Sequence, residues 1–166
     1  RVLGALEQAL VELSEQPSER GDLRLRLLLV CAHPAIDETV RTPLMLQVVL
    51  GLDAARIARA FLVTPAAMSQ RLVRAKQKIR DAGIPFDEPE PAERAGRMAA
   101  VYEAIYAAFA VDHDAAEVEP GVGSLAEEAL FLARVLTELS PNEPEALGLY
   151  ALLRFSHARR AAGTAA

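Results

Sequence analysis

The sequence predicts an all-α protein. Of its 166 residues, 52% are apolar and only 5% are aromatic, and alanine supplies much of the apolar share. Enrichment in Ala and Leu with few β-branched runs is typical of helices that pack closely through small residues. Apolar residues at helical spacing, separated by capping residues and by Pro or Gly stops, divide the chain into such helices. At this length the chain forms one domain or two small ones.

The segment 52–83 predicts two helices joined by one tight turn. Asp53 and Thr64 are both residues that cap helix N-termini well, and Pro65 suits the first position of a helix. The expected helices are a short one over 54–62 and a long one over 65–82, which Gly83 ends.

The long helix has an apolar stripe and a polar, cationic side. The stripe, at intervals of four, three and four, is formed by Met68, Leu72, Ala75 and Ile79. Off the stripe, small and polar residues come first and cations follow. This is the layout of a helix whose N-terminal end enters the major groove of DNA, where later cations meet phosphates. The alternative is an ordinary surface helix, because the helix dipole favours Lys and Arg near any C-terminus.

The segment 57–80, IARAFLVTPAAMSQRLVRAKQKIR, resembles region four of the sigma-70 family of RNA polymerase sigma factors. It is most similar to an extracytoplasmic-function (ECF) type subgroup with a TPR-like C-terminal extension. In that subgroup, segments like LRLLLVCAHPAI and AGIPF flank the helix-turn-helix, and both occur here, at 23–36 and 82–86. The resemblance implies that the long helix recognises the promoter minus-35 element.

The sequence departs from the family pattern at three places. Leu62 stands where many helix-turn-helix turns have Gly, although the subgroup also uses Leu, and Arg56 replaces the usual acidic residue. The Asn-Glu-Gly-Tyr-like motif of the extension is replaced by AAFAVDHDAAE at 107–117.

The predicted DNA contacts divide into base-reading and phosphate-binding groups. The residues expected to read bases are Ser69, Gln70 and Arg71, with Ala66 and Ala67 against thymine methyl groups. The residues expected to contact phosphates are Thr64 with the amides of the first turn of its helix, and Arg56, Arg59, Arg74 and Lys78.

The charge distribution fits a protein that meets DNA on one side only. The net charge is −5, but from Asp53 to Asp81 there are seven Lys or Arg and two acids, a local +5 that leaves −10 for the remainder. Such polarity predicts weak non-specific binding, because few phosphates are neutralised.

We expect four segments. They are a connector helix and loop over 1–20, with the loop at 14–21; a helix-turn-helix domain over 21–83; a stiff acidic linker over 84–92 that marks the domain boundary; and a TPR-like extension over 93–166.

Further helices are expected over 22–32, 37–50, 93–110, 125–139 and 145–160, with a loop at 111–123. Pro43 places the regular part of the second of these from Thr42 onward. In the extension, Ser124 and Glu127 form a capping box and Gly148 permits close helix approach. A lone TPR-like pair buries too little surface for a solenoid, so the extension is expected either to be truncated or to form a small bundle in which the pair packs on the helix over 93–110.

The composition also excludes several classes of protein. Cys31 is the only cysteine, so no internal disulfide forms, and a cytoplasmic location is the simplest expectation. No apolar run reaches the length of a membrane span. Cys31 and His33 alone do not make a metal site, and no catalytic or cofactor-binding constellation is present, so neither an enzyme nor a cofactor is predicted.

The predicted function is that of a transcription initiation factor fragment. The resemblance implies binding to minus-35 promoter DNA and to the β flap of RNA polymerase, with an extension that regulates activity, directly or by binding a regulatory protein. Sigma region two has no counterpart in this sequence. The sequence begins at Arg1 without Met, which is expected of an excised fragment or of an incomplete start. The alternative is a protein-interaction module whose helix-turn-helix is only a scaffold.

Overall fold

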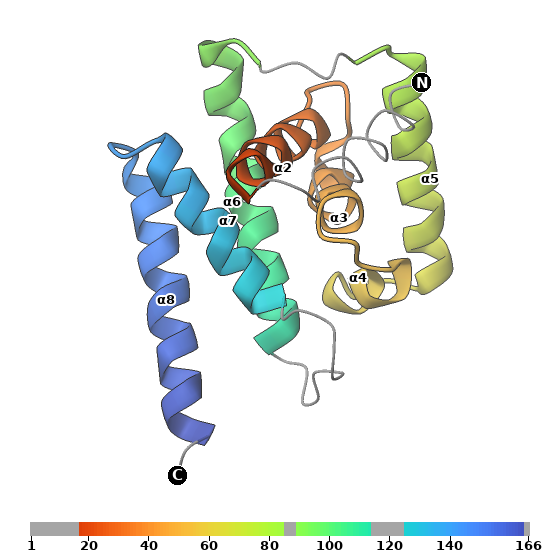
Figure 1. Cartoon of the computed structure of the whole chain (residues 1–166). Coiled ribbons are helices and arrows are strands. Elements are labelled where there is room, and N and C mark those ends of the chain that lie inside the picture. The colour runs from red at the N-terminus through yellow and green to blue at the C-terminus, as the bar shows by residue number, and fades with distance from the viewer. Residues whose placement is uncertain (1–16, 85–88, 114–124, 165–166) are drawn as a thin grey trace. The chain divides into compact units, whose positions relative to one another are not determined.

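In the computed structural model, the described residues are 17–84, 89–113 and 125–164, and they form helices and turns without strands (Figure 1). The helices are α2 (Pro17–Cys31), α3 (Glu38–Val48), α4 (Ala54–Ala60), α5 (Pro65–Asp81), α6 (Pro91–His113), α7 (Leu125–Leu139) and α8 (Pro144–Thr164). The all-α prediction is confirmed for these ranges. The predicted helix over residues 2–13, the Ser124 cap and most of the predicted loop at 111–123 lie outside the described residues.

The chain divides into two compact units, Arg1–Ala104 and Ile105–Ala166. The division falls inside α6, which contributes its first part to one unit and the rest to the other. The sequence placed the boundary earlier, in the proline-rich segment 84–92.

In the first unit, α3 is the central helix. It contacts α2, α4 and α5, and Figure 1 shows it between α2 and α5 with α4 below. The buried side chains of these four helices form one core, in which the largest fully buried residues include Leu27, Leu28, Leu44, Met45, Ile57, Met68 and Leu72. The predicted apolar stripe of α5 is therefore its buried side.

The caps that the sequence predicts for α4 and α5 are present. The Asp53 carboxylate accepts a hydrogen bond from the Arg56 amide at 2.8 Å, and the Thr64 hydroxyl oxygen accepts one from the Ala67 amide at 3.2 Å. Gly83 has φ +58° just after α5, as expected of a glycine that ends a helix. The bounds of α4 and α5 lie within two residues of the predicted ones.

Two predictions about the helices before the turn were wrong. Residues 17–21 are helical rather than part of a loop, because Pro17 takes the first position of α2, where its missing amide hydrogen costs nothing. Regular helix in α3 begins at Glu38 rather than Thr42, with Pro43 inside it. The Asp37 carboxylate caps this helix by accepting from the Thr39 amide at 2.9 Å, so α3 starts well before the proline.

The turn between α4 and α5 contains a strained residue. Leu62 has φ +53°, the one positive φ at a non-glycine among the described residues, and its side chain is 94% exposed. Left-handed backbone is unfavourable for a residue with a Cβ. A glycine would adopt this backbone conformation without that cost.

We expect Leu62→Gly to raise the free energy of unfolding of the first unit by about 0.5–1 kcal/mol. Removal of the left-handed strain stabilises the folded state by about 1–2 kcal/mol. The greater conformational freedom of glycine in the unfolded chain offsets this by about 0.5–1 kcal/mol. Urea denaturation followed by circular dichroism measures the difference. Leu62→Ala is the control, because it removes the exposed side chain and keeps the strain. Equal stabilisation by both variants would show that the exposed leucine, not the backbone, is the cause.

In the second unit, α7 packs against α8. The buried side chains of α7 include Leu132, Val135 and Leu136, and those of α8 are Ala146 and Leu153. Gly148 is exposed, and a Cβ added there would meet no atom within 4 Å, so the predicted close helix approach at Gly148 is not found. Instead α8 exposes Leu147, Leu152 and Phe155. No helix in the described ranges combines the length and apolar character that crossing a bilayer needs.

Candidate nucleic-acid interface

The polar side of α5 is open to solvent. Of the residues predicted to contact DNA, those that are exposed are Arg59, Thr64, Ala66, Ser69, Gln70, Arg71, Arg74 and Lys78. Ala67 and Arg56 are partly buried. Arg56 and Arg59 belong to α4, and the residues from Ala66 to Lys78 belong to α5. The buried stripe holds α5 against α3 and α4, so α5 presents its polar side chains from a fixed support.

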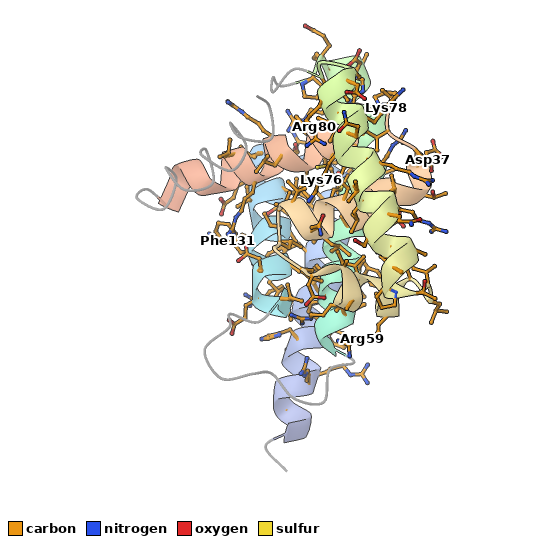
Figure 2. The ribbon with its side chains drawn as sticks, turned by 90° about the vertical axis from the view of Figure 1, so that its right-hand side faces the viewer. Asp37, Arg59, Lys76, Lys78, Arg80 and Phe131 are labelled. Carbon is orange, nitrogen blue, oxygen red and sulfur yellow. The ribbon has the colours of Figure 1, made fainter. Side chains whose placement is uncertain are left out.

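Successive residues of α5 are rotated by about 100° around the helix axis, so the predicted DNA contacts on this helix fall on different sides of it. Ala67, Arg71, Arg74 and Lys78 lie along one flank, which we call the cationic flank. Ser69 lies on the opposite flank, together with Lys76 and Arg80. In Figure 2, Lys78 and Asp37 are on one side of α5, and Lys76 and Arg80 are on the other. Ala66 and Gln70 lie between the flanks, farthest from the core. The structure therefore brings together most of the predicted cations but not all of the predicted base-reading residues.

The cationic flank forms one wall of a surface cleft of about 450 Å³. The opposite wall is the loop and first turn that begin α3. The lining residues are Ala35, Ile36, Asp37, Thr39 and Val40 from that wall, and Arg71, Arg74, Ala75 and Lys78 from α5. This cleft was not predicted, because it joins two segments that are more than thirty residues apart in the sequence.

The loop before α3 is fixed by side chains. The Arg41 guanidinium donates from Nε to the Ile36 carbonyl at 3.0 Å and from Nη2 to the Pro34 carbonyl at 3.5 Å. The Asp37 carboxylate accepts from the Thr39 hydroxyl and amide. These hydrogen bonds lower the pKa of Asp37, and Arg41 and Arg71 lower it further through their charges. Asp37 is thus ionised at neutral pH, and Arg71 acts on it across the cleft.

His33 also belongs to this loop. Its Nδ1 accepts a hydrogen bond from the Ala35 amide at 3.1 Å, which requires that nitrogen to be unprotonated. Partial burial lowers the pKa of His33 below 6.5, and the nearby charges of Arg97 and Arg41 lower it further, against a smaller opposite effect of Glu93.

We expect the first unit to lose stability as the pH falls below about 6.5. Below that pH the unfolded chain binds a proton at His33 more readily than the folded chain does, because the pKa of His33 is lower in the folded chain. The contribution of neutral His33 to the free energy of unfolding is therefore complete above the pKa of the unfolded chain and is lost as the pH falls through the pKa of the folded chain. Urea denaturation at pH 7.5 and at pH 5.5 measures this loss. His33→Asn removes the titrating group and should reduce the difference between the two pH values; an unchanged difference would assign the effect to other groups.

Cys31 is fully buried, and burial raises the pKa of its thiol to about 12 although the charge of Lys76 opposes this. A thiol with that pKa is a poor metal ligand and nucleophile, because the thiolate is the reactive form. Within the described residues, no three His, Cys, Asp or Glu side chains are grouped to hold a metal ion.

Arg97 is a buried cation that was not predicted from the sequence. Its Nη1 donates to the Leu29 carbonyl of α2 at 3.4 Å, and its Nη2 pairs with the Glu93 carboxylate at 2.6 Å. It joins the first part of α6 to α2 within the first unit. The spacing of four between Glu93 and Arg97 indicated an ion pair within the helix, but nothing local indicated its burial.

Two comparisons with known proteins give matches. Residues 97–166 match the model of a family of unknown function (DUF6596). The chain is 44% identical over 163 residues to an uncharacterized protein of Rhizobium meliloti (strain 1021). That alignment covers 92% of this chain and 38% of the relative, so the chain spans well under half the length of the relative. No solved structure matches the chain.

Proposed function

We propose that this chain is the promoter-reading part of a sigma-like transcription initiation factor. In this proposal α4 and α5 are the helix-turn-helix, and α5 enters the major groove at the minus-35 element. The observation that carries the proposal is the exposure of Gln70, Arg71 and Arg74 on a helix whose other side is fully buried. A helix held in this way reads DNA without having to reorganise on binding.

The partners follow from the resemblance in the sequence. The first unit would bind the β flap of RNA polymerase as well as DNA, in the cytoplasm. The second unit would be a TPR-like extension that regulates activity, directly or through a bound regulatory protein. Because the relative is much longer than this chain, the activity of a complete protein of this kind belongs to the proposal too.

Fluorescence anisotropy of labelled promoter DNA titrated with the full chain tests DNA binding. Four cations are assigned to phosphates (Arg56, Arg59, Arg74 and Lys78), so the logarithm of the binding constant should fall with the logarithm of salt with a slope of about −3 to −4. Binding of a promoter pool that exceeds binding of random DNA, with that slope, supports the proposal. An absence of binding at low salt contradicts it.

The second candidate is a protein-interaction module with a helix-turn-helix scaffold. The exposed apolar side chains of α8, Leu147, Leu152 and Phe155, favour it, since such residues gather where partners bind. On α8, Arg154 lies over the Tyr150 ring at 5.9 Å and Arg159 lies over the Phe155 ring at 5.8 Å. This candidate predicts no affinity for promoter DNA at any salt concentration.

A further inference from the structure

We propose that the cleft between the start of α3 and the cationic flank of α5 binds a small organic anion with an apolar body and a single negative head group. The site has a volume of about 450 Å³, within the range of small-molecule sites in proteins. Its ligand would be an aromatic or branched aliphatic monocarboxylate.

The floor of the cleft is apolar, which is the reason for proposing a ligand with an apolar body. Ile36, Val40 and Ala75 are 1%, 6% and 5% exposed, so they belong to the core of the first unit and form a firm apolar surface. A bare phosphate gains nothing from such a floor, whereas an aromatic or branched group buries apolar area on it.

The α5 wall carries two cations, which is the reason for proposing a negative head group on the ligand. Arg74 and Lys78 line the cleft, are exposed, and have no ion-pair partner within the described part of the chain. By contrast, Arg41, Arg97 and Arg134 all pair with a glutamate of their own helix. Two unpaired cations beside an apolar floor leave a place for one anion from outside the chain.

The opposite wall limits the ligand to one negative charge. Asp37 lines the cleft, and the charge of Arg71 already acts on it. A second anionic group on the ligand would meet this carboxylate, so the head is directed toward Arg74 and Lys78 while the uncharged end faces Asp37.

Ligand binding has a consequence for DNA. The cations of this flank are also assigned to DNA, so an occupied cleft excludes DNA from them. This consequence rests on the proposed function, but binding of the ligand does not, and the two are measured separately.

The test uses the full chain, labelled with ¹⁵N, and 2-naphthoate as the probe. We expect saturable amide shifts confined to 35–40 and 71–78. Inorganic phosphate, which is an anion without an apolar body, and 2-naphthylmethanol, which is the apolar body without an anion, should each bind at least tenfold more weakly. Phosphate binding as tight as naphthoate binding would overturn the proposal and leave an anion site of the kind that contacts a DNA backbone.

Two variants sharpen this test. Ala35 is exposed and lines the cleft, so Ala35→Phe fills it without changing charge or core and should abolish the naphthoate shifts. Arg74→Gln should weaken naphthoate binding at least tenfold, whereas Arg80→Gln, on the other flank, should not. Naphthoate shifts that persist in Ala35→Phe, or that centre on α8, would overturn the assignment. In fluorescence anisotropy, naphthoate should displace DNA from the unmodified chain. If the chain binds no DNA, the proposed function is wrong, and the amide shifts still show whether naphthoate binds in the cleft.

Discussion

Leu72→Ala is expected to lower the free energy of unfolding of the first unit by about 2–5 kcal/mol. Leu72 is 1% exposed and lies in the middle of the buried stripe of α5. Its removal loses apolar burial and leaves a cavity where α5 packs against α3 and α4, and close-packed neighbours relax only partly into such a space. Because native domains are stable by only about 5–15 kcal/mol, a loss of this size removes a large share of the total.

The neighbouring residue provides the control. Val73 is 61% exposed, so Val73→Ala should change stability by less than about 0.5 kcal/mol. Since the chain has two compact units, a single denaturation curve can merge two transitions. Native-state hydrogen exchange of the α5 amides reports on the first unit alone. Similar losses in both variants would mean that α5 is not seated by its apolar stripe.

The elements that the sequence predicted well depend on local interactions. The Asp53 and Thr64 caps act on amides within three residues, and Gly83 ends α5 through its own backbone freedom. The 3.6-residue period identified the buried side of α5, because one helix face must meet the core. Such features do not require knowledge of the rest of the fold.

The wrong or missed features depend on distant residues or on competing local signals. Pro43 favours a helix start, but the Asp37 cap, supported by the Arg41 contacts with the preceding loop, starts α3 earlier. The burial of Arg97 depends on a carbonyl of α2 that is 68 residues away in the sequence. For the same reason the cleft beside α5 could not be predicted from either of its walls alone.

The candidate site was predicted as a set of residue types rather than as a surface. Small residues followed by Ser, Gln and Arg suggested a reading helix, and the exposure of Ser69, Gln70 and Arg71 is what such a helix needs. The sequence did not indicate that Ser69 would lie on the flank opposite Arg71. A helix in the groove presents one side more deeply than the other, so Ser69 and Arg71 are expected to differ in their effects on DNA recognition.

Arg71→Ala is expected to weaken binding of specific promoter DNA by about 1–3 kcal/mol, roughly five- to 150-fold, and to relax the preference at one base pair. Arg71 is exposed on the cationic flank of α5. In the proposed function it contacts a base edge. A guanidinium that donates two hydrogen bonds to guanine loses both in the alanine variant, and no neighbour replaces the fork geometry. Anisotropy titrations against the selected promoter and its single-base variants measure both effects.

Two matched variants on the same helix separate base reading from charge. Lys78→Ala, one turn or more toward the C-terminus, should weaken specific and random DNA alike and make the salt slope less steep by about 1. Arg80→Ala should change neither the affinity for DNA nor the salt slope, because Arg80 lies on the other flank and donates to the Gln77 side chain. If Arg71→Ala weakened specific and random DNA equally, Arg71 would be a phosphate contact, and base reading would pass to Gln70 at the outermost position of α5.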